Sequence, residues 1–205
     1  LILVAMIFAV AMTFIDQTIV AIAIPDIQSD LHLSSTGAQW IINGYLLALA
    51  AMFAAGGKIA DIAGHKSMVI VGTIVFAAAS ALVSAVPDGS AAEAWMITFR
   101  VIQGVGAAIM FPAALAIVVG SFPLEQRGRA LAIFFAAAGG LTAVGPLVGG
   151  YLTEWTWRSI FWINIPIGAL ALLMLIPTMN LPIPSMPFKT KVAKMDIAGN
   201  VVLLG

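Results

Sequence analysis

The chain has 205 residues, of which 62% are hydrophobic and 9% are charged, and its nine basic side chains balance its nine acidic ones. A soluble globular domain carries about 25% charged residues, so this composition excludes that class and predicts a membrane protein. The zero net charge gives no indication of a nucleic-acid partner, and the absence of cysteine excludes disulfides and thiolate metal sites.

Six apolar stretches are long enough to cross a bilayer as helices, which takes about 20 residues each. They lie at 1–24, 40–56, 67–86, 95–119, 130–152 and 160–176, and a seventh begins near Asp196 and is cut off at Gly205. The predicted fold class is therefore all-α, a polytopic bundle of six transmembrane helices with the lipid bilayer as its surroundings.

The charges in the short connections predict the orientation of the bundle. Basic residues mark the cytoplasmic side, and one side carries Lys58, Lys66, Arg127, Arg129, Lys189, Lys191 and Lys194. The opposite side carries Asp26, Asp30, Asp88, Glu93 and Glu154, together with Arg158 and all five tryptophans, Trp40, Trp95, Trp155, Trp157 and Trp162. Tryptophans concentrate at membrane interfaces. We therefore expect a multi-pass protein of the cell membrane with a cytoplasmic N-terminus.

Composition also suggests how the chain is divided. Residues 1–176 form the six-span bundle, and residues 177–194, which are rich in proline and then in lysine, have the composition of a cytoplasmic linker. Residues 195–205 begin a further, truncated span. The chain thus has the organisation of the N-terminal portion of a larger protein.

A spacing of glycines and charges occurs twice. The first copy is Gly56, Gly57, Asp61 and His65, and the second is Gly149, Gly150, Glu154 and Arg158. The intervals between the residues are the same in both copies. The two segments are predicted on opposite membrane faces. Three spans repeated with inverted topology build each half of many secondary transporters, so we expect two inverted three-helix repeats, although one short echo can also arise by chance.

Two charges are predicted inside the membrane, Asp16 in the first span and Arg100 in the fourth. A charge there costs at least about 2.5 kcal/mol and normally faces a cavity or a partner. At 1.5 Å per residue both lie at a similar depth in the outer half, and Gln103, one turn after Arg100, extends the polar face. The pair is a candidate for proton coupling or substrate binding; the alternative is a static ion pair between two helices.

The fifth span is rich in helix-perturbing residues: Gly140, Gly145, Pro146, Gly149 and Gly150. Gly145 and Gly149 are four residues apart, a spacing that lets another helix approach closely, and Pro146 removes a backbone donor. Tight helix packing is the direct role that this pattern predicts. A bent and closely packed helix pair can also seal a pathway against proton leak.

Together, these features resemble the major facilitator superfamily, in its fourteen-span drug:proton antiporter branch. The resemblance rests on six ordered segments: IDQTIVAIAIP at 15–25, GKIADIAGHK at 57–66, RVIQGVGAA at 100–108, GLTAVGPLVGG at 140–150, WRSIFWINIPIG at 157–168 and MDIAG at 195–199. It implies that residues 100–108 serve proton coupling, that residues 140–150 form the antiporter motif and that a C-terminal half of the same transporter completes the substrate cavity.

The resemblance implies that residues 57–66 are the superfamily's signature loop, which latches the closed state of the transporter. Gly57, Asp61, Gly64 and Lys66 are in their usual places in this loop. Positions 62 and 65, usually arginine in the family, are here Ile62 and His65. Histidine changes its charge near neutral pH, so we expect a weaker, pH-sensitive latch in which Glu125 serves as another partner. The alternative is a tolerated substitution in a solvated loop.

The function that these observations favour is secondary active transport, a proton-coupled export of hydrophobic or cationic small molecules driven by the proton gradient without a cofactor. Alternatives are a carrier for a metabolite such as an amino acid, siderophore or sugar, a membrane scaffold, or an inactive truncated fragment. An enzyme is not expected, because His32 and His65 lie in opposite connections and neither a nucleophile–base pair nor a metal-ligand spacing is present.

Overall fold

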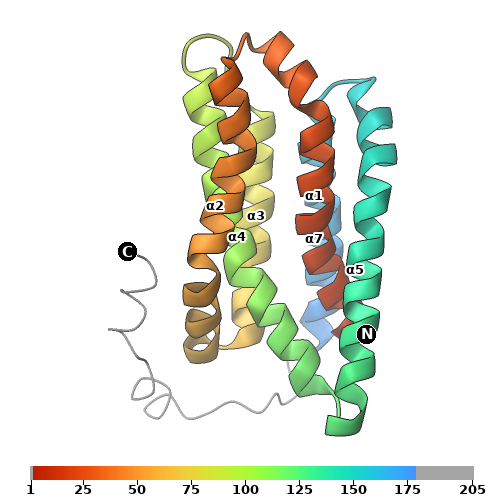
Figure 1. The fold of residues 1–205 in the computed structure, drawn as a ribbon. Helices are drawn as coiled ribbons and strands as arrows, with labels where there is room; N and C mark the ends of the chain where they lie inside the picture. Colours follow the sequence, from red (N-terminus) through yellow and green to blue (C-terminus); the bar gives the residue numbers. More distant parts are fainter. Residues whose placement is uncertain (1, 179–205) are drawn as a thin grey trace.

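The computed structural model describes residues 2–178, which form a bundle of helices that run alternately up and down (Figure 1). The elements are α1 (Ile2–Asp30), α2 (Ser35–Ala63), α3 (His65–Ser84), α4 (Ala92–Ser121), α5 (Leu124–Thr153), α6 (Ser159–Trp162), α7 (Asn164–Leu175) and the 3₁₀ turn η1 (Ile176–Thr178). The described chain begins and ends at the same end of the bundle (Figure 1), as an even number of membrane crossings requires.

Five helices, α1 to α5, are long and apolar enough to cross a membrane, and α6 and α7 together form a shorter apolar helical segment, Ser159–Leu175. The sixth predicted span is divided at Ile163 into α6 and α7. Pro166, in the first turn of α7, has no N–H to donate to the carbonyl of Trp162, so this one helical hydrogen bond is missing, while Ile167 still donates to the carbonyl of Ile163 at 3.4 Å. Most of the predicted linker and the start of a further span, residues 179–205, lie outside the described residues.

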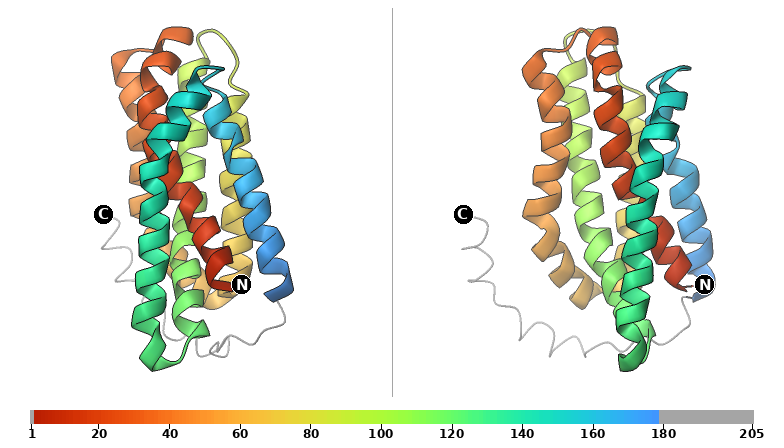
Figure 2. Two further views of the ribbon diagram at one scale, coloured as in Figure 1. Left: turned by 90° about the vertical axis from the view of Figure 1, so that its right-hand side faces the viewer. Right: turned by 45° about the vertical axis from the view of Figure 1, so that its right-hand side comes forward.

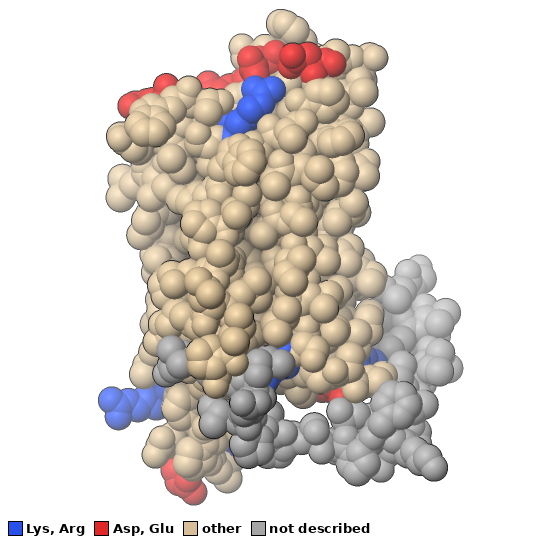
Figure 3. Space-filling view, turned by 180° about the vertical axis from the view of Figure 1, so that it is seen from behind, with Lys and Arg blue, Asp and Glu red and all other residues tan. Residues whose placement is uncertain are grey.

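Charge is segregated between the two ends of the bundle. Most of the visible acidic side chains lie at one end together with a basic one, and the other visible basic side chains lie at the opposite end beside a few acidic ones (Figure 3). The side of the bundle that Figure 3 shows is covered between the two ends by uncharged residues, as a surface in contact with lipid requires. That the end with most of the basic residues is cytoplasmic stays a prediction from the charges.

The signature segment 57–66 is not the polar turn that the sequence predicts. Helix α2 continues through Gly57 and Asp61 to Ala63, α3 begins at His65, and the whole reversal is made at Gly64. Gly64 has a φ of 99°, a left-handed backbone conformation that glycine adopts without steric cost. The predicted end of this helix was therefore too early. The apolar character of α2 lets the helix continue to Ala63, and Gly64 ends it.

The packing of the helices supports the two inverted repeats. Helix α2 packs against α4 as α5 packs against α1, and α3 packs against α4 as α7 packs against α1. Figure 2 shows α5 beside α1 from two further directions. Exchanging α1 with α4, α2 with α5 and α3 with α7 therefore maps these four helix contacts onto one another. The echoed glycines follow the same rule, since Gly56 faces Ala108 of α4 and Gly149 faces Ile19 of α1.

Gly56→Ala is expected to destabilise the protein much more than Gly57→Ala. A Cβ on Gly56 would overlap the backbone carbonyl of Ala108, whereas a Cβ on Gly57 would lie 3.5 Å from Cβ of Pro112, an ordinary contact. Overpacking of this kind costs roughly 1–3 kcal/mol, while alanine in an open helical position is up to about 1 kcal/mol better than glycine. Thermal unfolding of the purified full-length protein measures the difference; equal midpoints for the two variants would contradict the packing.

Candidate functional site

The buried centre of the bundle is an ion pair between Asp16 of α1 and Arg100 of α4. Nη1 of Arg100 donates to Oδ2 of Asp16 at 2.5 Å, and neither side chain has more than 1% of its surface exposed. Gln103 lies beside them, with Nε2 donating to Oδ1 of Asp16 at 2.9 Å and Oε1 accepting from Nη1 of Arg100 at 2.8 Å. The structure thus brings the three predicted residues into direct contact.

Helix α2 holds the guanidinium in place from its other side. Nε of Arg100 donates to the backbone carbonyl of Ile41 at 3.1 Å, and Cζ lies 4.4 Å from the centre of the Tyr45 ring. A buried cation needs both paired charge and filled hydrogen bonds, and the aromatic face adds a favourable electrostatic contact. Arg100 is therefore held between α1 and α2 by contacts on both sides of its guanidinium.

Two residues of this network were not predicted from the sequence. Asn164, the first residue of α7, donates from Nδ2 to Oδ1 of Asp16 at 3.1 Å and to Oγ of Ser80 in α3 at 2.9 Å. Ser80 in turn donates to the backbone carbonyl of Phe161 in α6 at 2.8 Å. The available signal was an amide side chain in an apolar segment, which in a membrane is normally paired or functional.

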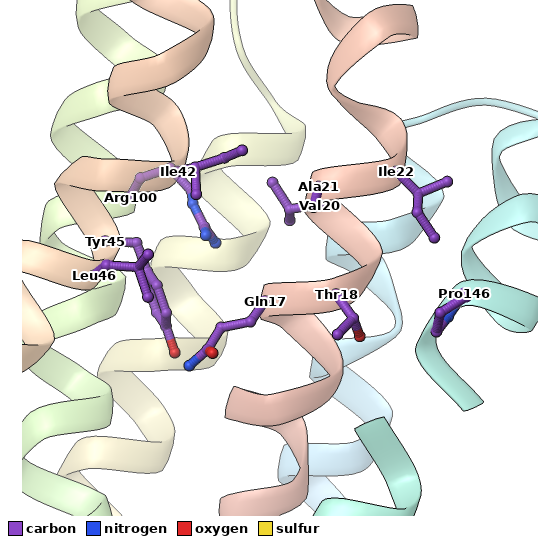
Figure 4. Close-up of a pocket in the computed structure, with 10 residues that line it drawn as sticks. All are labelled: Gln17, Thr18, Val20, Ala21, Ile22, Ile42, Tyr45, Leu46, Arg100 and Pro146. Carbon is purple, nitrogen blue, oxygen red and sulfur yellow. The ribbon is translucent and has the colours of Figure 1, made fainter. Parts of the chain in front are cut away.

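A cavity of about 390 Å³ opens beside this network, between α1, α2, α4 and α5 (Figure 4). Apolar side chains make up most of its wall, with Gln17, Thr18, Tyr45 and Arg100 as the polar groups; the lining residues are Gln17, Thr18, Val20, Ala21, Ile22, Ile42, Tyr45, Leu46, Arg100 and Pro146. The Tyr45 hydroxyl is buried and has no hydrogen-bond partner among the described residues. An apolar wall with a few polar groups is the usual make-up of a small-molecule site.

The glycines of α5 divide into two groups. A Cβ on Gly145 would overlap Oγ1 of Thr18, and one on Gly149 would lie 2.9 Å from Cγ1 of Ile19, so these two glycines let α5 lie directly on α1. A Cβ on Gly140 or Gly150 would meet nothing within 4 Å among the described residues. The close-packing role predicted for the motif therefore belongs to Gly145 and Gly149.

At the opposite end from Arg158, Asp61 and His65 form a contact within the signature segment. Nε2 of His65 lies 3.0 Å from Oδ1 of Asp61. Lys66, in the first turn of α3, is largely buried. Glu125 lies in the first turn of α5, and its part as another partner of this segment stays a prediction.

His65→Arg is expected to remove a pH dependence from transport by the full-length protein. Between about pH 5 and 8, histidine is the side chain that can change its charge, whereas arginine stays charged, so only the wild-type contact with Asp61 can weaken as the pH rises. Transport rates across this range should change with pH in the wild type and stay flat in the variant. His32→Gln, in the opposite connection, is the matched control. Identical pH profiles for wild type and His65→Arg would reject the idea.

A second polar cluster closes the acidic end of the bundle. Asp30, beyond the first predicted span, accepts from Nε1 of Trp157 at 2.9 Å and from Nη1 of Arg158 at 3.2 Å, and Cζ of Arg158 lies 4.4 Å from the Trp157 ring. The Trp157 hydrogen bond, followed by Arg158, holds the pKa of Asp30 below its ordinary value. Trp157 is 5% exposed, because its indole packs inward to reach this carboxylate.

The sequence model of the Major Facilitator Superfamily matches residues 6–199. The chain belongs to this superfamily. Its curated relatives include the tetracenomycin C resistance and export protein of Streptomyces glaucescens, 43% identical over 83% of this chain and 31% of the relative, and the methylenomycin A resistance protein of Bacillus subtilis, 39% identical over 79% and 34%. The chain thus spans about a third of the length of these superfamily members.

Solved structures of the superfamily share the fold. The inward-open xylose transporter XylE from E. coli superposes with a TM-score of 0.73, covering 98% of this chain and 54% of XylE at 14% identity. A bacterial homologue of the human lysosomal transporter Spinster gives 0.75, covering 91% and 44% at 22% identity. The described bundle therefore corresponds in extent to about half of a complete transporter fold.

Proposed function

We propose that the full-length protein containing this chain is a proton-coupled exporter of hydrophobic or cationic small molecules. The observation that carries the proposal is the buried ion pair of Asp16 and Arg100 at the edge of an apolar cavity. An ionisable pair inside a membrane marks a proton or ion pathway unless it is purely structural. The proton gradient supplies the driving force, and no cofactor takes part.

The chemistry of coupling follows from the charges. As a carboxylate, Asp16 neutralises Arg100; when Asp16 binds a proton it loses its charge, and the attraction that holds α1 to α4 at this point weakens. Protonation and ion pairing are therefore competing states of Asp16. A carrier that binds substrate with Asp16 ionised, and resets with Asp16 protonated, exchanges one for the other across the membrane.

The cavity favours substrates with large apolar surfaces. Its wall is mainly aliphatic, and its polar groups are sparse: the amide of Gln17, the hydroxyls of Thr18 and Tyr45, and the edge of Arg100 (Figure 4). A sugar would require many hydrogen bonds, and each unpaired hydroxyl that is buried would cost affinity. The names of the two relatives, a tetracenomycin C resistance and export protein and a methylenomycin A resistance protein, agree with a drug substrate.

We further propose that a C-terminal half, in a fourteen-span protein of the cell membrane with its N-terminus in the cytoplasm, completes the cavity. Helices α2 and α5 leave most of their surface exposed in the described bundle, and both line the cavity beside α1 and α4. A second bundle on this side would cover these faces and enclose the substrate. The remaining exposed surface would face lipid.

The experiment uses the full-length gene in cells that lack their major efflux pumps. Energised cells loaded with a fluorescent lipophilic cation should lose it faster than cells without the gene, and a protonophore should abolish the difference. Efflux that continues after the proton gradient has collapsed would reject proton coupling. Cells that express the protein and show no efflux would reject drug export.

A further inference from the structure

We propose that Asn164 is a positioning residue for Asp16, one that hydrogen-bonds to it both as a carboxylate and as a protonated acid. This inference rests on the proposed function, because it assigns Asn164 a part in the proton cycle of the same site. Asn164 is fully buried at the start of α7, and its carboxamide contacts Asp16 directly. An amide is both donor and acceptor, so it can serve either form of a carboxyl group.

The orientation of the Asn164 amide is set by Ser80. The single hydroxyl hydrogen of Ser80 goes to the backbone carbonyl of Phe161 at 2.8 Å, so Oγ must accept from Asn164 and not donate to it. The NH₂ group of Asn164 therefore faces both Ser80 and Asp16. This arrangement suits the ionised carboxylate, which accepts hydrogen bonds and donates none.

Protonated Asp16 needs a partner that accepts, and the other two side chains that donate to it cannot change roles. Arg100 has no acceptor atom. Gln103 uses its Oε1 to accept from Arg100 at 2.8 Å, and turning its amide would place NH₂ against the guanidinium. Of the three side chains whose donors reach Asp16, Asn164 alone can offer it an oxygen.

Oδ1 of Asn164 is buried and has no hydrogen-bond partner among the described residues. Turning the amide over therefore breaks only the two hydrogen bonds that Nδ2 donates, to Asp16 and Ser80. After the turn, Oδ1 accepts from protonated Asp16, and the Ser80 hydroxyl can rotate from Phe161 to Asn164. The protonation state of Asp16 would then be transmitted to α3 and to α6, next to the break at Ile163.

The other groups near Asp16 do not offer a competing explanation for a pH effect. The titratable and charged side chains that face it are Arg100 of α4 and Tyr45 of α2. Helices α6 and α7 contain no charged residue, and those of α3 and α5 lie in the first two turns, at the opposite end from Arg158. A change at position 164 thus acts on Asp16 and not on a distant titrating group.

The test compares three variants of the full-length transporter in membrane vesicles, using a fluorescent lipophilic cation. Asn164→Leu keeps the side-chain size but can neither donate nor accept. It should reduce uphill, gradient-driven transport about tenfold or more, and leave counterflow exchange at equal pH within about twofold, because exchange does not pass through protonated Asp16. A tenfold loss corresponds to one charge-assisted hydrogen bond, about 1.4 kcal/mol.

Two further variants separate positioning from mere structure. Asn164→Asp puts a second carboxyl group beside Asp16, and since two adjacent carboxylates resist full ionisation, the pH profile of uphill transport should move about one unit or more towards alkaline pH. Thr73→Val removes a buried hydroxyl of α3 that donates to Sδ of Met110, outside the Asp16 network, and should leave coupling nearly intact. If Asn164→Leu does not reach the membrane, the Asn164→Asp profile decides alone.

Three results would overturn the inference: unchanged uphill transport in Asn164→Leu, an unchanged pH profile in Asn164→Asp, or a loss in Thr73→Val equal to that in Asn164→Leu. Failure of the proposed function looks different. In that case the wild type itself would show no protonophore-sensitive transport, or Asp16→Asn would transport as well as the wild type, and the inference about Asn164 would fall with it.

Discussion

Arg100→Gln is expected to lower the free energy of unfolding by roughly 3–5 kcal/mol, because it leaves the Asp16 carboxylate buried without a compensating charge. Arg100 also bonds to Ile41 and Gln103 and lies over the Tyr45 ring, so its loss frees groups on three helices. Thermal unfolding of the purified full-length protein measures the effect as a large fall in the midpoint.

The matched control is the double variant Asp16→Asn with Arg100→Gln. Two neutral amides of similar shape can hydrogen-bond to each other, and replacing a buried pair as a unit is often close to neutral. The double variant should therefore recover most of the stability that Arg100→Gln loses. A double variant no more stable than the single one would show that the ion pair is not the source of the effect.

Asp16→Asn is expected to reduce uphill efflux to the level of cells without the transporter, since asparagine cannot exchange a proton. The single variant leaves Arg100 uncompensated, so part of any loss could come from folding. The double variant with Arg100→Gln resolves this ambiguity: it should be stable and still fail to transport uphill. Proton-driven efflux by a stable double variant would reduce the Asp16–Arg100 pair to a structural role.

The Asp16–Arg100–Gln103 cluster could be predicted from the sequence because depth in a membrane follows from counting residues. The ends of an apolar span are visible in the chain, and the rise per residue is fixed. Charges at equal depth in two spans must find partners, since hydrocarbon offers none. The geometry then agreed with the prediction down to direct contact of all three side chains.

Asn164 could not be predicted in the same way. Depth says nothing about which helices are neighbours, and only the packing of α7 against α1 brings Asn164 to Asp16. The same limit applies to the glycines: the pair Gly56 and Gly57 looks alike in sequence, but the crossing of α2 with α4 buries only Gly56 against a backbone. Helix rotation, which side-chain packing sets, decides both cases.

The positions at which the helices end could not be predicted from the local sequence either. A run of mixed charges at 57–66 reads as a loop, but its residues are good enough helix formers for α2 to continue to Gly64. Conversely, the apolar run at 160–176 predicts one continuous helix, but Pro166, in the first turn of α7, removes one of its helical hydrogen bonds. In both places a single glycine or proline decides where the helix ends.

The central claim is that Asp16 carries the proton that is exchanged for substrate. The most direct test is the pH change when a lipophilic cation is added to the purified full-length protein in weakly buffered solution, with a pH-indicator dye. The wild type should release protons in proportion to bound cation, and the double variant Asp16→Asn with Arg100→Gln should bind the cation and release none. Equal proton release by both proteins would contradict the claim.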